Sequence, residues 1–371
     1  MQGRQGAGAE KDPKIKGSEA IAIQPCFGIV IIGRNEGERL VACLQSAIAQ
    51  VLFQSQSQSQ SQSQSHPIVY VDSGSTDRSV AQAQALGVEV VVLNMAEPFT
   101  AARARNLGLK RLLELYPISY VQFVDGDCAL NPVWCQTALA SLQEHPKAAV
   151  VCGRRRERFP EASVFNMLCD LEWNTPVGEA IACGGDALMR VAALQQVGGY
   201  RPHLIAGEEP ELCFRLRHQG WQILRIDAEM TLHDAQMMRF GQWWTRAVRG
   251  GHAYAEVSWL HRHDPERFWQ RECFRILTWG LGLPLVSLVL CPFTHGWSLG
   301  LWLLYPLLAG KIFRQKRDRD GSKTALYYAL FCTLIKFPEL QGLLVFHFHR
   351  LRGDRSVLIE YKGAASPNET V

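Results

Sequence analysis

The chain has 371 residues, 47% of them hydrophobic and 20% charged, which is enough to bury one large domain with an appendage. Its formal net charge of +4 permits phosphorylated ligands or anionic lipid as partners but gives no reason to expect nucleic acid. The eleven cysteines include no Cys-x-x-Cys pair and no zinc-like Cys/His spacing, which favours reduced thiols over a disulfide framework or a zinc site.

The chain opens with a polar, glycine-rich stretch. Residues 1–20 carry several lysines but none of the apolar core that a secretory signal needs. We therefore expect a flexible tail over residues 1–24, followed by a catalytic domain over residues 25–260.

Between residues 27 and 153, apolar strands alternate with segments of helical periodicity. Helices are expected between the strands, one beginning at Thr76-Asp77 and another at Thr100, because Thr and Asp are favoured N-caps. Repeated strand–helix units predict an α/β fold with a mostly parallel sheet flanked by helices. The predicted strands are Phe27–Ile32, Pro67–Val71, Val88–Leu93, Tyr120–Val124 and Ala148–Cys152.

One interruption of this pattern has low complexity. Residues 54–65 are six tandem Gln-Ser pairs, and although strict alternation could mimic a strand, every side chain is polar and none would be buried. A solvated, disordered loop within the catalytic domain is therefore predicted there.

The last third of the chain changes character. No Asp, Glu, Lys or Arg occurs between Arg275 and Lys311, an interval that contains the apolar stretches Ile276–Phe293 and Trp297–Gly310. A spanning helix needs roughly 20 apolar residues, so a hairpin packed on the catalytic domain or lying in the membrane interface is the alternative to spanning. We expect a helical, membrane-associated region over residues 261–371. The basic residues after Lys311 would place it at the cytoplasmic face of the membrane.

Candidate binding residues follow the ends of the predicted strands, where open α/β sheets bind their ligands. Asp72 ends the second strand and precedes small residues and a helix start, an arrangement that suits a carboxylate contacting a base or ribose. Arg34 and Glu36 follow the first strand. The neighbouring Ser75-Thr76-Asp77 is interpreted as ordinary helix capping.

Two carboxylates follow the fourth strand with a single glycine between them. Asp125 and Asp127 would repel each other unless a cation lay beside them. Mg²⁺ or Mn²⁺ is the expected cation, because these ions bind through one or two carboxylates together with substrate phosphates. Asp-x-Asp is often only a turn, but its position directly after a buried strand favours a metal site here.

A cluster of acidic residues, Gly207-Glu208-Glu209-Pro210-Glu211, precedes an amphipathic helix. Acidic side chains at a helix N-terminus commonly complement the helix dipole. A carboxylate at this place could instead serve as general base on an acceptor hydroxyl.

These motifs together resemble the family 2 glycosyltransferases. The segments that match that family in order and approximate spacing are Arg34-Asn35-Glu36, Val71–Asp77 (VDSGSTD), Ala104–Gly108 (ARNLG), Phe123–Asp127 (FVDGD), Gly184–Arg190 (GGDALMR) and Gly207–Leu212 (GEEPEL). The resemblance covers about residues 27–259 and implies the GT-A fold of nucleotide-sugar-binding enzymes.

The resemblance also implies which residues bind the donor. Asp72 would contact the nucleobase, with Arg34 and Glu36 nearby, and Arg105 would help to orient the nucleotide. Asp125 would contact the ribose or the metal. The full set of donor-binding candidates is Arg34, Glu36, Asp72, Arg105, Asp125 and Gly185.

Metal binding and base catalysis are implied for a second set of residues. Asp127, together with Asp125, would ligate a metal that bridges the diphosphate. His233 could reach the diphosphate or the metal, although a lone histidine is commonly structural. Glu209 would be the catalytic base, but the Glu-Asp pair usual in the family is Glu208-Glu209 here, which leaves open which of the two acts.

Two further segments have more than one interpretation. Gln242–Arg246 (QWWTR) is a distorted form of the Gln/Arg-x-x-Arg-Trp signature of processive synthases, so Trp243, Trp244 and Arg246 could line the acceptor side or pack between helices. Four arginines follow the fifth strand, at positions 154, 155, 156 and 158. We expect them on a solvated face, with binding of an anionic acceptor as the alternative.

We therefore predict inverting, metal-assisted transfer of a sugar from a UDP- or GDP-linked donor to a hydroxyl of a glycan or lipid-linked acceptor. A sugar nucleotidyltransferase is one alternative, but it needs a glycine-rich phosphate loop that Gly33-Arg34-Asn35-Glu36 does not supply. A membrane-bound scaffold with a degenerate transferase domain is another, and the intact Asp72, Asp125 and Asp127 weigh against it. A dinucleotide-binding dehydrogenase is disfavoured because no Gly-x-Gly-x-x-Gly follows a strand.

Overall fold

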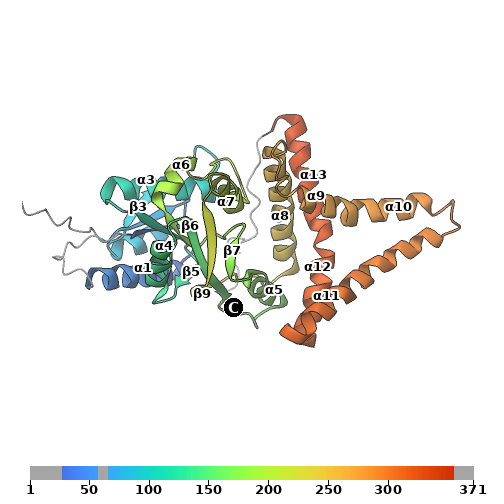
Figure 1. Cartoon of the computed structure of the whole chain (residues 1–371), viewed down its shortest axis with the longest axis horizontal. Helices are drawn as coiled ribbons and strands as arrows, with labels where there is room; N and C mark the ends of the chain where they lie inside the picture. Colours follow the sequence, from blue (N-terminus) through green and yellow to red (C-terminus); the bar gives the residue numbers. More distant parts are fainter. Residues whose placement is uncertain (1–26, 57–65, 355–371) are drawn as a thin grey trace, which may run out of the picture.

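A single nine-stranded sheet forms the centre of the first domain (Figure 1). The computed structural model describes residues 27–56 and 66–354, so the predicted tail over residues 1–24 lies outside the described residues. The strands are β1 (Phe27–Gly33), β2 (Ile68–Asp72), β3 (Glu89–Val92), β4 (Tyr120–Asp125), β5 (Cys128–Leu130), β6 (Ala148–Glu157), β7 (Gly178–Ala180), β8 (Ala187–Arg190) and β9 (Gln222–His233).

The sheet runs in the order β3-β2-β1-β4-β8-β6-β9-β5, and β7 also pairs with β9. The first four strands in this order are mutually parallel, as strand–helix alternation predicts. Beyond β4 the sheet is mixed: β8 is antiparallel to both of its neighbours, β5 and β7 are antiparallel to β9, and β6 is parallel to β9. The regular parallel pattern therefore covers β1 to β4, which the helices α1, α2 and α3 connect.

Every residue of β1 from Phe27 to Ile32 is buried, because helices cover both faces of the parallel half of the sheet. Gly108 shows how closely α3 lies on this sheet, since an added Cβ would come within 2.4 Å of Val30 Cγ1. The helices of this domain are α1 (Glu38–Gln56), α2 (Ser79–Ala85), α3 (Ala101–Leu115), α4 (Trp134–Glu144), α5 (Val164–Trp173), α6 (Val191–Val197) and α7 (Glu208–His218).

The two predicted helix starts have different outcomes. Thr100 caps α3 as predicted, and its hydroxyl accepts a hydrogen bond from the Arg103 amide at 3.1 Å. The start predicted at Thr76-Asp77 is displaced, because α2 begins at Ser79 and the Asp77 carboxylate accepts from the Ser79 amide at 2.9 Å. The Thr76 amide instead donates to the side chain of Asn35 at 2.7 Å, which ties the loops after β1 and β2 together.

The predicted Gln-Ser loop overlaps the first helix. Because α1 extends to Gln56, residues 54–56 are helical where a loop was expected. Residues 57–65 lie outside the described residues.

The C-terminal region is helical, as predicted, and part of it extends away from the sheet. Figure 1 shows α10 and α11 converging on a tip far from the first domain. The elements are α8 (Phe240–Leu260), α9 (Gln270–Ile276), the π-helical η1 (Leu277–Gly282), α10 (Leu283–Leu290), the 3-10 helix η2 (Trp297–Leu303), α11 (Leu304–Asp320), α12 (Ser322–Leu334) and α13 (Lys336–Arg352).

Helix α8 connects the sheet domain to the C-terminal helices. It ends at the expected domain boundary, residue 260, yet it packs along α13 of the C-terminal region. Two glycines permit this contact. A Cβ on Gly251 would lie 1.9 Å from the carbonyl oxygen of Glu339, and one on Gly342 would lie 1.9 Å from that of Val248. The two helix backbones therefore touch directly, and α12 packs beside them on α5.

Candidate active site

A cleft of about 1970 Å³ lies beyond the carboxyl ends of β1 and β4. The sheet domain lines one side, while α8, α12 and α13 line the other and contribute Arg246, Lys336 and Glu339. The candidate residues that line the cleft are Arg34, Glu36, Arg105, Asp125, Asp127, Glu208, Glu209 and His233. Residues that are distant in the sequence thus converge on one cavity, as the strand-end positions predict.

Arg105 occupies the centre of the acidic side chains in this cleft. Its guanidinium is buried, and Nη2 lies 2.9 Å from Oδ1 of Asp125. Nη1 lies 3.0 Å from an oxygen of Glu208 and 3.0 Å from an oxygen of Glu209. One arginine therefore offsets the mutual repulsion of three carboxylates and fixes α7 against β4.

Gly185 lies directly against this charged network. A Cβ at that position would come within 2.6 Å of Arg105 Nη2 and 2.7 Å of Asp125 Oδ2. A glycine is therefore required for the backbone to approach the ion pair. The neighbouring Gly184 lines the cleft itself.

The two glutamates at the start of α7 are not equivalent. The Glu208 side chain is 5% exposed and that of Glu209 is 14% exposed, so Glu209 is the more accessible of the two. Burial and the adjacent negative charge of Glu208 raise the pKa of Glu209 to about 7, although Arg105 opposes the shift. A carboxyl group that titrates near neutral pH is well suited to act as a general base.

The third acid of the cluster has a structural role. Glu211 is fully buried, and its carboxylate lies 2.6 Å from Arg201, 2.8 Å from Arg215 and 3.1 Å from His261. Burial alone would raise the pKa of Glu211, but hydrogen bonds from His261 and Arg215 lower this pKa to about 2. This carboxylate therefore stays ionised and anchors α7.

Asp127 and His233 meet at the end of the sheet. His233 Nε2 lies 3.3 Å from Asp127 Oδ2, and the ring packs edge-on against Trp173 at 4.7 Å. His233 Nδ1 is buried and makes no hydrogen bond, although Glu157 lies 3.6 Å away. Ligand atoms of Asp127, Cys128 and His233 lie within 4.8 Å of one another, which makes a compact potential metal site.

Cys128 is the weakest member of that group. Burial, together with the negative charge of Asp186, raises the pKa of the Cys128 thiol well above its usual range. The sulfur stays protonated at neutral pH and is a poor ligand. Among the described residues, ten cysteines carry free thiols.

Asp125 is held by a second arginine that the sequence interpretation placed elsewhere. Arg155 Nη2 lies 3.2 Å from Asp125 and 2.7 Å from the buried Asp186. Asp186 in turn accepts hydrogen bonds from the Asp125 amide at 3.0 Å and from the Thr231 hydroxyl at 2.7 Å. Arg155 and Asp186 therefore complete the support of Asp125 from the side opposite Arg105.

The predicted solvated face is wrong for two of the four arginines. Arg154 is buried and pairs with Asp170 at 2.8 Å, and Arg155 lies in the cleft, whereas Arg156 pairs with Glu229 at an exposed site. The physical reason is that β6 continues to Glu157, with a register shift between Arg154 and Arg155 that turns both inward. Asp186 belongs to the GGDALMR block, which could have pointed to it.

Asp72 lies beneath the cleft. It is 2% exposed, and one of its oxygens accepts from the amides of Gly74 and Ser75 at 3.0 and 2.9 Å. The Tyr70 hydroxyl donates to the other at 3.0 Å. The neighbouring Ser73, Thr76 and Asp77 line the cleft, so Asp72 shapes that loop, and its direct contact with a base stays a prediction.

The aromatic pair on α8 packs between helices. Trp243 is buried against Phe331 of α12, with ring centroids 4.9 Å apart, and the Trp244 indole donates to Gln341 of α13 at 2.9 Å. Arg246 lines the cleft and lies 2.8 Å from Glu172. Of these three residues, only Arg246 is therefore available to a ligand.

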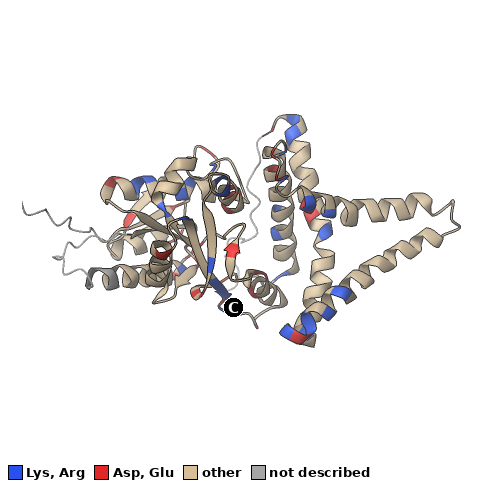
Figure 2. Ribbon diagram, in the orientation of Figure 1, with Lys and Arg blue, Asp and Glu red and all other residues tan. Residues whose placement is uncertain are grey.

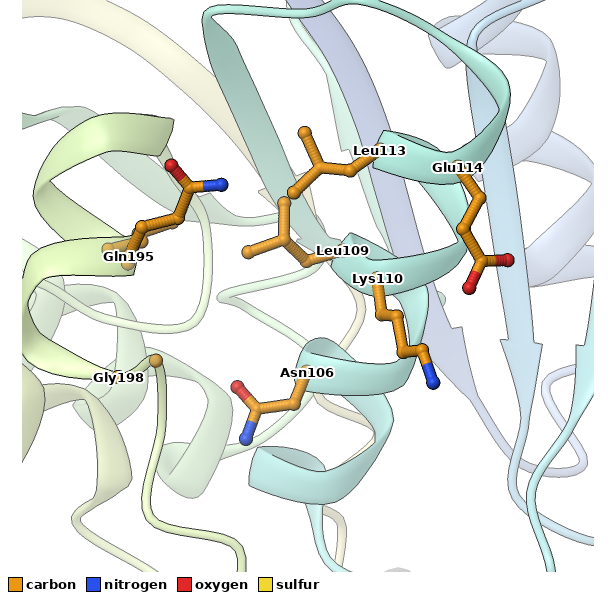
Figure 3. Close-up of a pocket in the computed structure, with 9 residues that line it drawn as sticks. Asn106, Leu109, Lys110, Leu113, Glu114, Gln195 and Gly198 are labelled. Carbon is orange, nitrogen blue, oxygen red and sulfur yellow. The ribbon is translucent and has the colours of Figure 1, made fainter.

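A second pocket of about 590 Å³ lies between α3 and α6 (Figure 3). Lys110 and Glu114 are among its lining residues. The Asn106 side chain there is bound to the backbone of Tyr200, donating at 2.7 Å and accepting at 2.9 Å. This pocket contains none of the clustered carboxylates, so the cleft is the candidate active site.

Comparisons with known proteins bear on the family and the fold. Residues 28–198 match the model of the family described as glycosyl transferase family 2. A solved structure of the mannosyltransferase PcManGT from Pyrobaculum calidifontis, in complex with GDP-Man and Mn²⁺, is similar at a TM-score of 0.56 and 15% identity, covering 85% of this chain and 88% of that chain. At that identity the likeness shows the fold alone.

Two further solved structures are more distant. S. aureus TarS 1-349 has a TM-score of 0.44 and 14% identity, covering 88% of this chain and 92% of that chain. Glucosyl-3-phosphoglycerate synthase from Mycobacterium tuberculosis has a TM-score of 0.44 and 17% identity, covering 63% and 79%. No curated protein matches the sequence. Residues 28–198 therefore form a glycosyl transferase family 2 domain, and the chain has the GT-A fold of glycosyltransferases.

Proposed function

We propose that the protein transfers a sugar, with inversion, from a UDP- or GDP-linked donor to a hydroxyl of a glycan or lipid-linked acceptor. The observation that carries the proposal is the convergence of Asp127, His233 and the Arg105-bound Glu209 on one cleft. The structural relative from Pyrobaculum calidifontis contains GDP-Man and Mn²⁺, which supports a nucleotide sugar and a divalent cation as ligands here as well.

The residues present fit a hard divalent cation such as Mg²⁺ or Mn²⁺. Asp127 and His233 would hold it, with Asp125 at the adjoining position beside the diphosphate. His233 Nε2 faces Asp127, so it is the ring nitrogen that could share an ion with that carboxylate, and Nδ1 lies 3.6 Å from Glu157, which could accept its N–H. When bound, the cation would neutralise charge that develops on the diphosphate leaving group.

Glu209 is the proposed general base. Its carboxylate would take the proton of the acceptor hydroxyl, whose oxygen then attacks the anomeric carbon from the face opposite the diphosphate, so that the configuration inverts. Arg105 keeps this carboxylate in place and, because it opposes the pKa increase, keeps part of it ionised at neutral pH. Glu208, which is more buried, is proposed to fix α7 through the same arginine.

The donor would lie along the loops after β1 and β2. Arg34 and Glu36 line that end of the cleft, and the Arg34 guanidinium stacks on Phe99 at 4.8 Å. We propose that Asp72 determines the shape of the base pocket through the loop that it binds. Gly185 would support the donor site by letting the backbone lie directly against the Arg105–Asp125 ion pair.

The acceptor would enter from the side of the C-terminal helices. Arg246 and Lys336 line that side, which favours an acceptor that carries negative charge. We propose that the enzyme works at the cytoplasmic face of a membrane, where a lipid-linked acceptor would be at hand.

A nucleotide-binding experiment tests this function. Melting of the full chain would be followed with UDP, GDP and their sugars, with and without Mn²⁺. We expect one nucleotide series to raise the Tm in the presence of Mn²⁺, and Asp127→Asn to remove the metal-dependent part of that rise. If neither series raises the Tm, the proposal fails, and product formation from a sugar phosphate and a nucleoside triphosphate would identify a nucleotidyltransferase instead.

A further inference from the structure

The segment between Arg275 and Lys311 projects from the rest of the protein with its apolar side chains exposed. We call residues 276–310 the apolar hairpin. It contains no Asp, Glu, Lys or Arg. Its two legs are residues 276–290 and 297–310, and Figure 2 shows them without charged residues, in contrast to the rest of the molecule. Phe293 and Trp297 at its tip are 78% and 86% exposed. An apolar surface of this size on a soluble protein marks a contact with another apolar phase.

Several polar groups within the hairpin bond to other groups of the hairpin. The Ser298 hydroxyl donates to the carbonyl of Ser287 at 2.6 Å, and the Trp302 indole donates to the Ser287 hydroxyl at 2.7 Å. The Tyr305 hydroxyl donates to the carbonyl of Trp279, which joins the two legs. Because an unpaired polar group is costly in hydrocarbon, these contacts suit a lipid environment.

Basic residues flank both ends of the hairpin. Arg271 and Arg275 precede it, and Lys311, Arg314 and Lys316 follow it. Figures 1 and 2 show that both legs join the rest of the molecule on the same side of α12 and α13. Positive charges at both bases complement anionic lipid headgroups on a single membrane surface.

The legs are short for a bilayer. Each has about 15 residues and would reach about 22 Å as a helix, whereas the hydrocarbon core is about 30 Å thick. The second leg begins with the 3-10 helix η2, and the tip between the legs is Cys291–Gly296. The tip therefore reaches into the hydrocarbon without crossing it.

The other candidate span is held by protein. Within the residues that the structure describes, Gln270–Leu290 and Ser322–Arg352 meet the length and hydropathy of a membrane span. The first of them includes Arg271, Glu272 and Arg275, so only its part within the hairpin is free of charged residues. In the second of these, Ala325 and Ala329 are fully buried and Leu343 is 2% exposed. Separating Ser322–Arg352 from α5 and α8 would expose these buried side chains to a new environment. We therefore expect this segment to stay packed on the protein.

We propose that the apolar hairpin inserts into a bilayer as a re-entrant loop, with both ends on the side of the catalytic domain, while α12 and α13 stay packed on that domain. The occupant of the exposed apolar surface is thus lipid. The inference stands apart from the transfer reaction, since a chain without transferase activity could insert in the same way.

Vesicle flotation of the full chain tests the insertion. Phosphatidylcholine vesicles with phosphatidylglycerol would be compared for wild type and for the double variant Phe293→Asp/Trp297→Asp. We expect the double variant to lose vesicle binding by roughly tenfold or more, because aspartate at the tip would enter hydrocarbon. The matched control is Val133→Asp, which adds a carboxylate at a 61% exposed apolar residue of the sheet domain and should leave binding unchanged.

Two results would overturn the insertion. One is that the wild-type chain does not float; the other is that the double variant, with an unchanged melting curve, floats as well as wild type. If light scattering also shows that wild type is a dimer without lipid and the double variant is a monomer, the occupant is a second copy of the chain.

Trypsin added outside vesicles that carry the protein tests the topology. The hairpin contains no tryptic site, so cleavage at both basic ends should leave the peptide Ile276–Lys311 in the membrane, detectable by mass spectrometry. Protection of Arg314 and Lys316 from outside trypsin would mean that the first leg crosses the membrane. That result, or release of the peptide into solution, would overturn the re-entrant arrangement.

Discussion

The cleft and the apolar hairpin differ in the kind of interaction on which each depends. In the cleft, Arg105 alone contacts three carboxylates, and each charge is held by another charge. The hairpin has no Asp, Glu, Lys or Arg, and several of its polar groups bond to one another. Because one region depends on preorganised charge and the other on apolar surface, we expect substitutions in each to leave the function of the other intact.

The largest effect is expected from the proposed base. Glu209→Gln should lower kcat by about 10²- to 10⁴-fold, the usual contribution of general base catalysis, without changing vesicle flotation. The isosteric control Glu208→Gln should keep most of its activity, because that side chain is the more buried of the pair. Initial rates of nucleotide release measure both. Equal, mild losses would mean that neither glutamate is the base.

The next largest effect is expected from the proposed metal ligand. Asp127→Asn should lower activity by about 10- to 100-fold at saturating donor and raise the Mn²⁺ concentration needed for half-maximal rate. Cys128→Ala is the neighbouring control and should retain activity, because its protonated thiol is not expected to ligate. A Mn²⁺ titration of the transfer rate checks both. Full turnover of Asp127→Asn would exclude the metal site.

Arg155 provides a sharper test of charge in the cleft, because its neighbour on β6 is a matched control. Arg155→Gln should reduce kcat/KM by about tenfold, since Asp125 and Asp186 lose a shared partner. Arg156→Gln breaks only an exposed pair with Glu229 and should have almost no effect. Both variants should still float with vesicles. Equal activity of the two would show that Arg155 is not a positioning residue.

The smallest effect expected is a shift in pH dependence. A base must be deprotonated to act, so the rate should rise with pH and level off above the Glu209 pKa of about 7. Glu208→Gln removes a negative neighbour that raises this pKa, so the midpoint should move to lower pH, by up to about one unit. Rates from pH 5 to 9 measure the midpoint. A midpoint that does not move, or moves upward, would contradict this electrostatic account.

Sequence patterns predicted the parallel half of the sheet because its strands are mostly apolar and alternate with helices. In the mixed half, the apolar start of β6 was predicted as Ala148–Cys152, but the short strands and the mixed pairing were not. Its strands β5, β7 and β8 have three or four residues, too few for periodicity to register, and β6 extends through charged residues that no apolar pattern marks. Their positions depend on pairing between distant segments.

The candidate site was predictable where strand ends and motif order coincide, as for Asp125, Asp127 and Glu209. It was not predictable where a role depends on contacts. Arg105 was expected beside the nucleotide, and its three carboxylate partners lie 20 or more residues away in the sequence. Asp72 has the position of a ligand residue, but hydrogen bonds from Tyr70 on its own strand and from the loop that follows occupy both of its oxygens.

The glycine contact between α8 and α13 sets the width of the catalytic cavity. Arg249 and Gly250 on α8 and Glu339 on α13 all line the cleft beside the place where the backbones touch. Even a methyl group at Gly251 or Gly342 would force the helices apart, since each Cβ would lie 1.9 Å from a carbonyl oxygen. Such a wedge would move the proposed acceptor side of the cleft away from Glu209, the proposed base, so two glycines would set the distance between them.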